Sequence, residues 1–271
     1  MLKILSLLFL LTTVSFAKVY YARVEPYEVR NITSDVSGKV LYTNENMLGK
    51  KLSNRAFIKI DDTLNRDELE SVRKKMSYLK NTLTTNEKIL KNLKEALARK
   101  KENFKKIMAL SIKSKVEKDR EFYDLVASEN SYLATLKEMN SLKTNISDLA
   151  FREKQLMKMI QDKSIVANGF VLYEIKVKPQ SVVNIGTPLA TVADVSKAIA
   201  VVYLDENDLI NLKHEVLYIN GKKSSYKLSR ISKIADGKNI SRYSAQIVMK
   251  APKIFSNLIK IELKEEHDES K

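Results

Sequence analysis

Residues 69–107 read LESVRKKMSYLKNTLTTNEKILKNLKEALARKKENFKKI, and this stretch decides the fold. Twelve positions in it are separated by alternating steps of three and four residues, and ten of the twelve are apolar. Sustained over about five heptads, this spacing is typical of the contact face of a coiled coil. The twelve positions are Leu69, Val72, Met76, Leu79, Leu83, Asn86, Leu90, Leu93, Leu97, Lys100, Phe104 and Ile107. The stretch therefore predicts a long amphipathic helix that needs a helical partner.

A second helix is expected after the first. Residues 50–168 contain neither glycine nor proline, and because these residues interrupt helices, their absence predicts long uninterrupted helices. A second row of mostly apolar positions changes phase near Met139 and Leu142, and comprises Leu125, Tyr132, Leu136, Met139, Leu142, Ile146, Leu149, Glu153, Leu156 and Ile160. Two arms of about 45 residues would each reach about 65–70 Å.

The two arms are expected to run antiparallel through a short turn. Ser114 followed by Glu117 fits a capping box that starts the second helix, and Asn65 with Glu68 fits the same pattern at the first. From Arg99 to Arg120 there are nine basic and three acidic residues, so the turn end is strongly positive. The formal charge of the whole chain is +15, and most lysines lie off the apolar rows, where they solvate the helices.

Short β segments on either side of the helices repeat each other. The pattern G-x-V-L-Y occurs at Gly38–Tyr42 and again at Gly169–Tyr173. Each copy is followed by a second turn and an apolar strand, and Asn54 and Gly186 occupy equivalent turns that tolerate left-handed backbone angles. The repeat predicts two half-modules that meet when the helices fold back on each other.

After Asp194 the chain alternates strands with turns, which predicts a small antiparallel β-barrel that also includes residues 19–32. The predicted strands are 198–204, 216–220, 226–234, 243–250 and 259–263, with a short capped helical turn at 205–209. The fold class is therefore α+β, with a long antiparallel hairpin inserted in a split β module.

Composition argues against an enzyme. The chain has no cysteine and two histidines, His214 and His267, so cysteine-based zinc sites, cysteine nucleophiles and iron–sulfur centres are excluded. No G-x-S-x-G accompanies His214. Asp61 and Asp62 precede a helix, where carboxylates complement the helix dipole. No catalytic, metal-binding or cofactor-binding residue is therefore expected.

The first 17 residues, MLKILSLLFLLTTVSFA, fit a cleaved export signal. Lys3 is followed by a short apolar run, and Ser15 and Ala17 supply the small residues that signal peptidase accepts. The apolar run is about half the length that spans a bilayer, so retention as an anchor is the weaker interpretation. An exported protein also makes nucleic acid an improbable partner.

The order of these parts resembles the periplasmic adaptor, or membrane fusion protein, family of tripartite efflux pumps. The resemblance covers nearly all of the mature chain, and each of its sequence segments is weakly specific alone. They are Val36–Val40, Leu52–Asp62, Ile165–Gly169, Gly186–Lys197 and Leu204–Leu209. The resemblance implies the segments 1–17 signal peptide, 18–32 strand joining the barrel, 33–62 lipoyl-like half A, 63–163 helical hairpin, 164–195 lipoyl-like half B, 196–263 β-barrel and 264–271 disordered tail. Gly38, Asn54, Gly169 and Gly186 are its expected structural turns.

The resemblance also implies that the hairpin tip docks a TolC-like outer-membrane channel. The family's tip motif has arginine, leucine and serine where this chain has Asn103, Ile107 and Ser114. Asparagine cannot form the forked hydrogen bonds of arginine, and Lys105 or Lys106 is the nearest replacement. The expected docking residues are Asn103, Lys106, Ile107, Ser111, Lys113, Ser114, Lys115, Glu117 and Asp119. Helix capping is the simpler role of Ser114.

The partners implied by the resemblance are an inner-membrane efflux transporter, of the RND type first and the ABC type second, a TolC-like channel, and further copies of the chain in a hexamer. The protein would then act in the periplasm, associated with the inner membrane through the pump, with the barrel and lipoyl-like module contacting the transporter. Two alternatives stay open. One is a lipoyl-type cofactor carrier, which the helical insertion and export disfavour, and the other is a basic structural coiled coil that binds anionic lipid.

Overall fold

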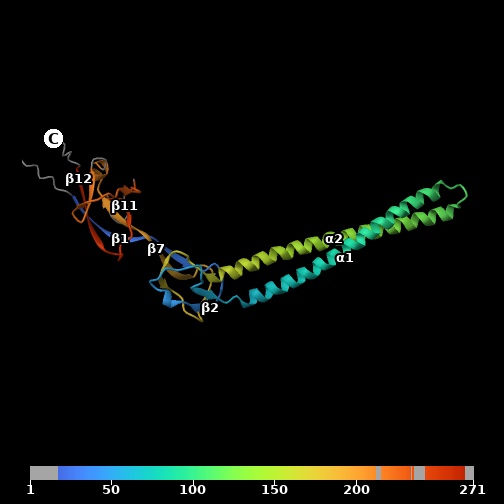
Figure 1. The fold of residues 1–271 in the computed structure, drawn as a ribbon, viewed down its shortest axis with the longest axis horizontal. Coiled ribbons are helices and arrows are strands. Elements are labelled where there is room, and N and C mark those ends of the chain that lie inside the picture. Colours follow the sequence, from blue (N-terminus) through green and yellow to red (C-terminus); the bar gives the residue numbers. More distant parts are fainter. Residues whose placement is uncertain (1–17, 212–214, 233, 235–241, 266–271) are drawn as a thin grey trace, which may run out of the picture.

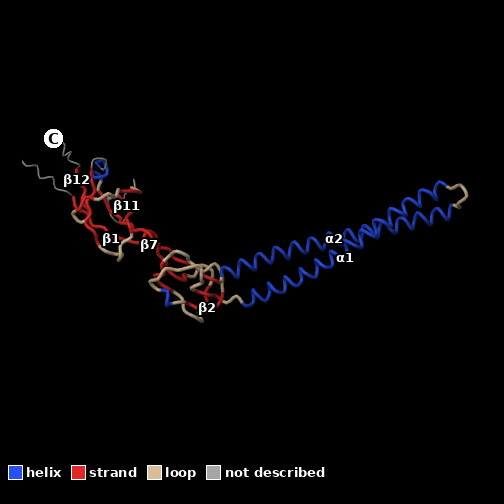
Figure 2. Tube along the Cα trace, in the orientation of Figure 1, coloured by secondary structure: helices blue, strands red, loops and turns tan. Residues whose placement is uncertain are grey.

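The computed structural model describes residues 18–211, 215–232, 234 and 242–265. These residues form an elongated molecule in which two β modules lie at one end and a helical hairpin projects from them (Figure 1). The hairpin consists of α1 (Thr63–Ala109) and α2 (Lys115–Asp162). Figure 2 shows that the helices are uninterrupted and that one short loop joins them at the far end. The predicted antiparallel hairpin is confirmed.

The predicted apolar row of α1 is its contact face. From Leu69 to Ile107, all twelve predicted positions are buried or half-buried, and every other residue in this range is exposed. The ten positions predicted on α2 are likewise buried or half-buried. On α1 the regular spacing places one side chain per half-heptad against the opposite helix, so this helix contributes a single row to the interface.

The predicted start is confirmed for α2 but not for α1. Ser114 caps α2 as predicted: its Oγ accepts a hydrogen bond from the Glu117 backbone N–H, and the Glu117 carboxylate accepts one from the Ser114 backbone N–H at 3.0 Å. The predicted start at Asn65 is wrong. α1 begins at Thr63, whose backbone N–H donates to the Asp61 carboxylate at 3.0 Å. Asn65 instead accepts a hydrogen bond from Lys163 at 2.6 Å.

The two β half-modules meet in one core, as the repeat predicted. The four-stranded sheet has the order β4-β3-β2-β6, so the two strands that precede the hairpin lie in the middle and each pairs directly with a strand that follows the hairpin. Its elements are β2 (Gly38–Thr43), β3 (Ile58–Ile60), β4 (Ser164–Ile165) and β6 (Val182–Val183), with η1 (Glu45–Met47) and β5 (Val171–Ile175) nearby. The shared core is Val40, Leu52, Phe57, Ile58, Ile60, Ile165, Leu172, Val177, Val183, Leu189, Ala190 and Val192. We call this unit the split module.

The sequence repeat is not repeated in burial. Val40 is completely buried in the first copy, whereas in the second copy the completely buried residue is Leu172. Leu172 aligns with Leu41, which is largely exposed. Because side chains alternate between the faces of a strand, the two copies are used one residue out of register.

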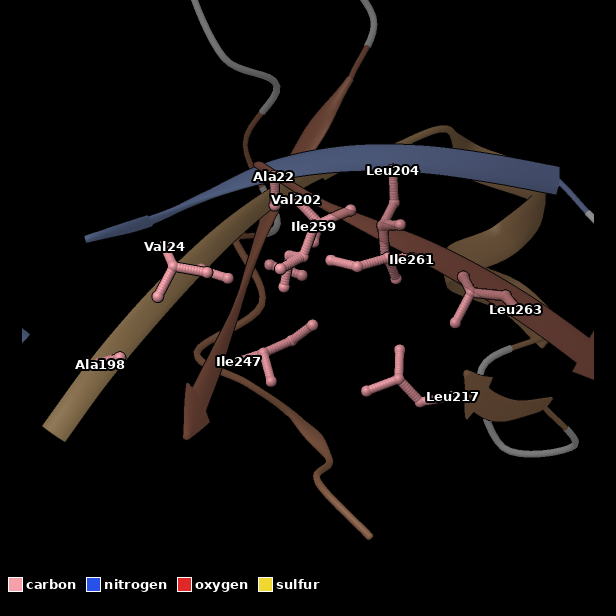
Figure 3. Packing of buried hydrophobic residues seen from close by; sticks show 12 residues of the cluster. Ala22, Val24, Ala198, Val202, Leu204, Leu217, Ile247, Ile259, Ile261 and Leu263 are labelled. Atoms are coloured by element: carbon pink, nitrogen blue, oxygen red, sulfur yellow. The ribbon is translucent and has the colours of Figure 1, made fainter. Parts of the chain in front are cut away.

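The second β module is a half-barrel. Its sheet has the order β10-β11-β7-β1-β12-β8-β9 and its pairings are antiparallel. The elements are β1 (Lys18–Thr33), β7 (Pro188–Leu204), α3 (Glu206–Asn211), β8 (Glu215–Ile219), β9 (Lys222–Lys223), β10 (Leu228–Ser229), β11 (Tyr243–Lys250) and β12 (Leu258–Glu265). The sheet curls around an aliphatic core that includes Val202, Leu204, Ile247 and Ile261 (Figure 3).

Most of the predicted strands after Asp194 are present, with two differences. The segment 226–234 was expected to be one strand, but among its described residues only Leu228–Ser229 forms a strand, which pairs with Ile247 and Gln246. β12 continues to Glu265, two residues into the segment assigned to the tail. β1 and β7 also run on from the half-barrel into the split module, where β7 pairs with β5. These two long strands are the connection between the modules.

The four expected turn residues have different roles. Gly169 and Gly186 adopt positive φ angles of 88° and 85°, which favour glycine. Gly38 instead permits close packing, since a Cβ there would lie 2.7 Å from Cγ2 of Ile60. Asn54 lies in a bend, and it is not among the non-glycine residues with positive φ.

The predicted signal at residues 1–17, His214, His267 and residues 266–271 lie outside the described residues. Among the residues that are described, no helix combines the length and the apolar character needed to cross a membrane.

Candidate functional site

The hairpin tip exposes apolar side chains at its apex. The loop from Leu110 to Ser114 joins the helices, and Ile112 at its centre is 89% exposed. Met108, Leu110 and Val116 are also exposed beside it. Exposed apolar residues that gather in one place on a soluble surface commonly mark a contact with another molecule. The apex is therefore an apolar patch within a strongly basic end of the hairpin.

The capping box makes the tip rigid on the α2 side. Glu117 accepts hydrogen bonds from Lys113 Nζ at 3.0 Å and from Ser114 Oγ at 2.9 Å. The hydrogen bond from Lys113, reinforced by those from Ser114, lowers the pKa of Glu117 to about 2. The carboxylate therefore stays charged at any physiological pH, and Lys113 is held against the start of α2.

The structure brings the predicted docking residues together at one end, but not on one surface. Asn103 and Lys106 are exposed on the last turns of α1, where Lys106 pairs with Glu102 at 2.7 Å. Ile107 faces inward and lines a groove of ≈ 580 Å³. Ser111 and Lys113 lie in the loop, and Lys115 and Asp119 are exposed on α2. The groove is lined by Ile107, Lys113, Glu117, Arg120, Glu121, Tyr123, Asp124 and Ala127.

An aromatic cluster below the tip was not predicted. The ring centroid of Phe122 lies 6.1 Å from that of Phe104 and 5.8 Å from that of Tyr123. Tyr123 is 70% exposed and lines the groove. The sequence signal was two adjacent aromatic residues on a helix otherwise rich in charge, of which at most one can face the opposite helix.

A buried ionic network fixes the hairpin to the split module. Asp62 is buried, and its carboxylate accepts hydrogen bonds from Lys59 Nζ at 2.6 Å and Arg66 Nε at 2.9 Å. Burial acts to raise the pKa of Asp62, but the hydrogen bonds from Arg66 and Lys59 outweigh it and hold the pKa below its usual value. Lys59 also donates to Ser164 at 2.8 Å, which joins the two halves. We call this set the base network.

A second ionic cluster ties the first described residue to the half-barrel. Lys18 Nζ contacts Asp205 at 2.8 Å and Asp208 at 2.9 Å, and the Tyr20 hydroxyl donates to Asp208. The hydrogen bond from Lys18 lowers the pKa of Asp205, and the two carboxylates raise the pKa of Lys18. Burial and then Asp208 raise the pKa of the Tyr20 hydroxyl. The cluster anchors β1 to α3.

An apolar groove lies where the two β modules join. It has a volume of ≈ 370 Å³ and is lined by Arg23, Glu25, Pro26, Val29, Val171, Tyr173, Ala193, Val195, Phe255 and Ser256. Val29 and Tyr173 are exposed in its walls. Among the residues that the structure describes, no cluster of histidine, cysteine and carboxylate side chains has the form of a metal site.

The chain resembles solved structures of one architecture. MacA from Actinobacillus actinomycetemcomitans matches with a TM-score of 0.70 at 16% identity, over 92% of this chain and 78% of MacA. The membrane fusion protein Spr0693 from Streptococcus pneumoniae R6 matches with 0.59 at 14% identity, over 92% and 100%. A MacA–MexA chimera with the Pseudomonas aeruginosa MexA α-hairpin domain matches with 0.55 at 16% identity, over 92% and 82%. No protein-family model and no curated protein matches the sequence.

These likenesses show the fold. The chain has the architecture of a membrane fusion protein, in which a long helical hairpin interrupts a compact β module that continues into a β-barrel-like sheet.

Proposed function

We propose that this protein is a periplasmic adaptor that links an inner-membrane efflux transporter to a TolC-like outer-membrane channel, for the export of small molecules. The observation that carries this proposal is the separation of two different surfaces by a rod. At about 1.5 Å per residue, the 47 residues of α1 span about 70 Å. A rod of this kind allows one protein to contact two distant partners, and no step of bond making or breaking is assigned to its side chains.

The channel end is assigned to the hairpin tip. The apex combines exposed apolar residues with an excess of basic side chains, and the capping box ties the end of its loop to the start of α2. A preorganised apolar patch loses little conformational entropy when it docks, which favours a protein contact. Asn103 stands where the family resemblance leads one to expect arginine. We assign the polar part of the contact to exposed Lys106 and the aromatic part to Tyr123, which lines the groove.

The transporter end is assigned to the two β modules. Their junction carries the apolar groove with exposed Val29 and Tyr173, and both long strands of the connection line it. The family resemblance of the sequence favours an RND-type transporter, with an ABC-type transporter second. Energy for export would come from that transporter, and the adaptor would be held at the inner membrane by it.

Self-association into a ring, of six copies by family resemblance, would need contact surfaces on the sides of the hairpin. α1 carries an exposed row without charge at steps of three and four residues: Tyr78, Thr82, Thr85, Ile89, Asn92 and Ala96. α2 carries a comparable exposed row with one charge: Asn130, Leu133, Lys137, Asn140, Thr144, Ser147 and Phe151. Uncharged rows are uncommon on helices this rich in lysine and glutamate, and they suit packing against another helix.

The two uncharged rows lie on opposite sides of the hairpin. Thr82 and Ile89 are two and three heptads after Glu68, so they share the side on which Glu68 pairs with Arg152 at 2.6 Å. Ser147 precedes Met157 by ten residues, a spacing that keeps it on the side where Arg73 approaches Met157 at 3.6 Å. Opposite rows allow the α1 side of one copy to meet the α2 side of the next, which is the geometry of a closed ring.

The test uses the natural absence of cysteine. A cysteine introduced as Ser111→Cys at the tip is expected to cross-link to an outer-membrane channel protein in intact cells, because the loop is exposed at the apex. The matched control is Ser71→Cys, an exposed position near the base of the hairpin, which is expected to give no channel adduct. A folded, exported Ser111→Cys protein that captures no channel would overturn the proposal.

The same experiment addresses the alternative role. Liposomes of anionic lipid that bind the protein in a salt-sensitive manner, together with no channel adduct from Ser111→Cys, would identify a lipid-binding coiled coil instead.

A further inference from the structure

The middle of α1 is built from residues that weaken a helix. Residues 81–86 read NTLTTN, whereas residues 87–109 contain neither serine nor threonine and are rich in leucine, lysine, glutamate and alanine. β-Branched and asparagine residues are poorer helix formers than these. The hydroxyls of Thr82, Thr84 and Thr85 donate to the carbonyls four residues earlier, at 3.1, 3.1 and 3.2 Å. Such bonds compete with the backbone ladder and often bend helices.

The facing segment of α2 has the same character. Residues 139–145 read MNSLKTN, and the hydroxyls of Ser141 and Thr144 donate to the carbonyls four residues earlier, at 3.2 and 3.1 Å. The change of phase in the apolar row of α2 also falls here, between Met139 and Leu142. Two successive steps of three residues locally disturb the supercoil.

Cross-helix ion pairs show that the two segments lie at one level of the hairpin. Arg73 pairs with Glu153 at 2.6 Å, and Lys100 pairs with Asp124 at 2.8 Å. Thirteen residues beyond Arg73 is Asn86, and fourteen residues before Glu153 is Met139. Residues 81–86 and 139–145 therefore face each other midway along the hairpin.

Asn86 places an unpaired polar group in this layer. It is one of the two non-apolar members of the α1 row, it is 7% exposed, and within the described residues its Nδ2 has no hydrogen-bond partner. Met139 and Leu142 are the buried residues of α2 at this level. A buried donor without a partner loses the hydrogen bond that it makes to water in an opened state, so it favours opening at this layer.

We propose that residues 81–86 and 139–145 form a joint at which the hairpin bends. Four features coincide there: weak helix formers, back-bonding hydroxyls, a phase change and a buried unpaired amide. The tip lies about 24 residues, or about 36 Å, beyond the joint, so a bend of about 10° would displace the tip by about 6 Å. The joint lets the two ends of the rod be out of line while both helices stay paired.

The test compares the joint with a matched triple variant elsewhere on the hairpin. The joint variant is Thr84→Ala/Asn86→Leu/Ser141→Ala, and the control is Ser128→Ala/Ser131→Ala/Thr135→Ala, which removes three back-bonding hydroxyls where α1 has none opposite. None of these positions belongs to the uncharged rows, so self-association is left unchanged.

In the full protein we expect amide hydrogen exchange within 81–86 and 139–145 to be at least about fivefold faster than in the flanking turns. In the joint variant this exchange should slow to the flanking rate, and in the control it should stay faster. Uniform exchange along both helices of the unmodified protein, or unchanged exchange in the joint variant, would overturn the joint. The readout does not depend on a channel or transporter, so the joint and the proposed function can fail separately.

Discussion

The hairpin and the split module bury their side chains in different ways. The hairpin buries six residues along its whole length: Val72, Asn86, Leu97, Met139, Leu142 and Leu156. The split module buries twelve in a compact unit, and seven of them have no exposed surface: Val40, Ile58, Ile60, Leu172, Leu189, Ala190 and Val192. A single row of contacts can be extended to any length by adding heptads, whereas a core closed in three dimensions cannot.

The two regions also differ in how far the effect of a substitution extends. A substitution in the hairpin affects the layers next to it, since each layer contacts only its neighbours along the helices. A substitution in the split module affects residues that are more than 100 positions apart in the chain, because β3 before the hairpin pairs with β4 after it. The hairpin can therefore accommodate a weak layer at Asn86 that the split module could not.

The largest loss of stability is expected for a substitution in the core of the split module. Phe57→Ala should destabilise this module by about 3–5 kcal/mol, because it leaves a cavity among completely buried neighbours. Urea unfolding followed through tyrosine fluorescence would measure the loss, since the protein has no tryptophan. The matched substitution Phe151→Ala, on the exposed side of α2, should change stability by less than about 0.5 kcal/mol. Equal losses in the two variants would contradict the contrast between the regions.

An intermediate effect is expected where the two regions join. Asp62→Asn should cost about 1–3 kcal/mol at neutral pH, because Lys59 and Arg66 lose a buried charged acceptor. The folded pKa of Asp62 is lowered, so its contribution is present above the unfolded value near 4 and is lost as the pH falls below it.

The stability difference between Asp62→Asn and the unmodified protein should therefore shrink as the pH is lowered from 5 towards 2, as measured by urea unfolding. Asp67→Asn, an exposed carboxylate one turn further along α1, serves as the control and should show a much smaller loss. A difference that is constant with pH would contradict the role of the base network.

The smallest effect is expected at the tip. Ser114→Ala should weaken the start of α2 by about 1 kcal/mol through loss of the cap, while the split module is unaffected. Faster amide exchange confined to residues 115–120 would show it. Ser111→Ala in the adjoining loop should leave this exchange unchanged.

The cap also has a pH signature. The pKa of Glu117 is lowered to about 2, so its contribution is complete above about 4.5 and is lost as the pH falls through about 2. In Ser114→Ala the titration midpoint of Glu117, followed by NMR, should move upward, towards its unperturbed value. Lys113 keeps part of the shift because its hydrogen bond is the largest cause. An unchanged midpoint would show that the capping box does not hold this carboxylate.

Sequence reasoning succeeded where contacts are local and periodic. Spacings of three and four residues predict the apolar row of α1, the row of α2 that faces it and the cap at Ser114. A helix converts such spacings directly into one face. It failed at Asn65, because the Asp61 carboxylate accepts the Thr63 backbone N–H and starts the helix two residues earlier, a contact that the capping pattern alone does not distinguish. It also missed the aromatic cluster below the tip, because Phe122 and Tyr123 lie outside the predicted apolar row of α2 and both are exposed.

The β modules were predictable as a pair of halves but not in detail. The G-x-V-L-Y repeat marks both copies, yet Val40 is buried in one and Leu172 in the other, because bulges in the β2–β3 and β5–β7 pairings shift the register. Residues 226–234 have the composition of a strand, but pairing with β11 extends to two residues only. Pairing partners decide both outcomes, and they are distant in the chain.

The amino-acid order alone determined that the protein has a rod, how long the rod is and where it turns, because helix periodicity and capping act over a few residues. Folding in three dimensions decided how the rod is held and what its ends present: the base network, the register of the split module and the groove between the β modules. These features arise from groups brought together across long stretches of chain, and no local pattern encodes such contacts.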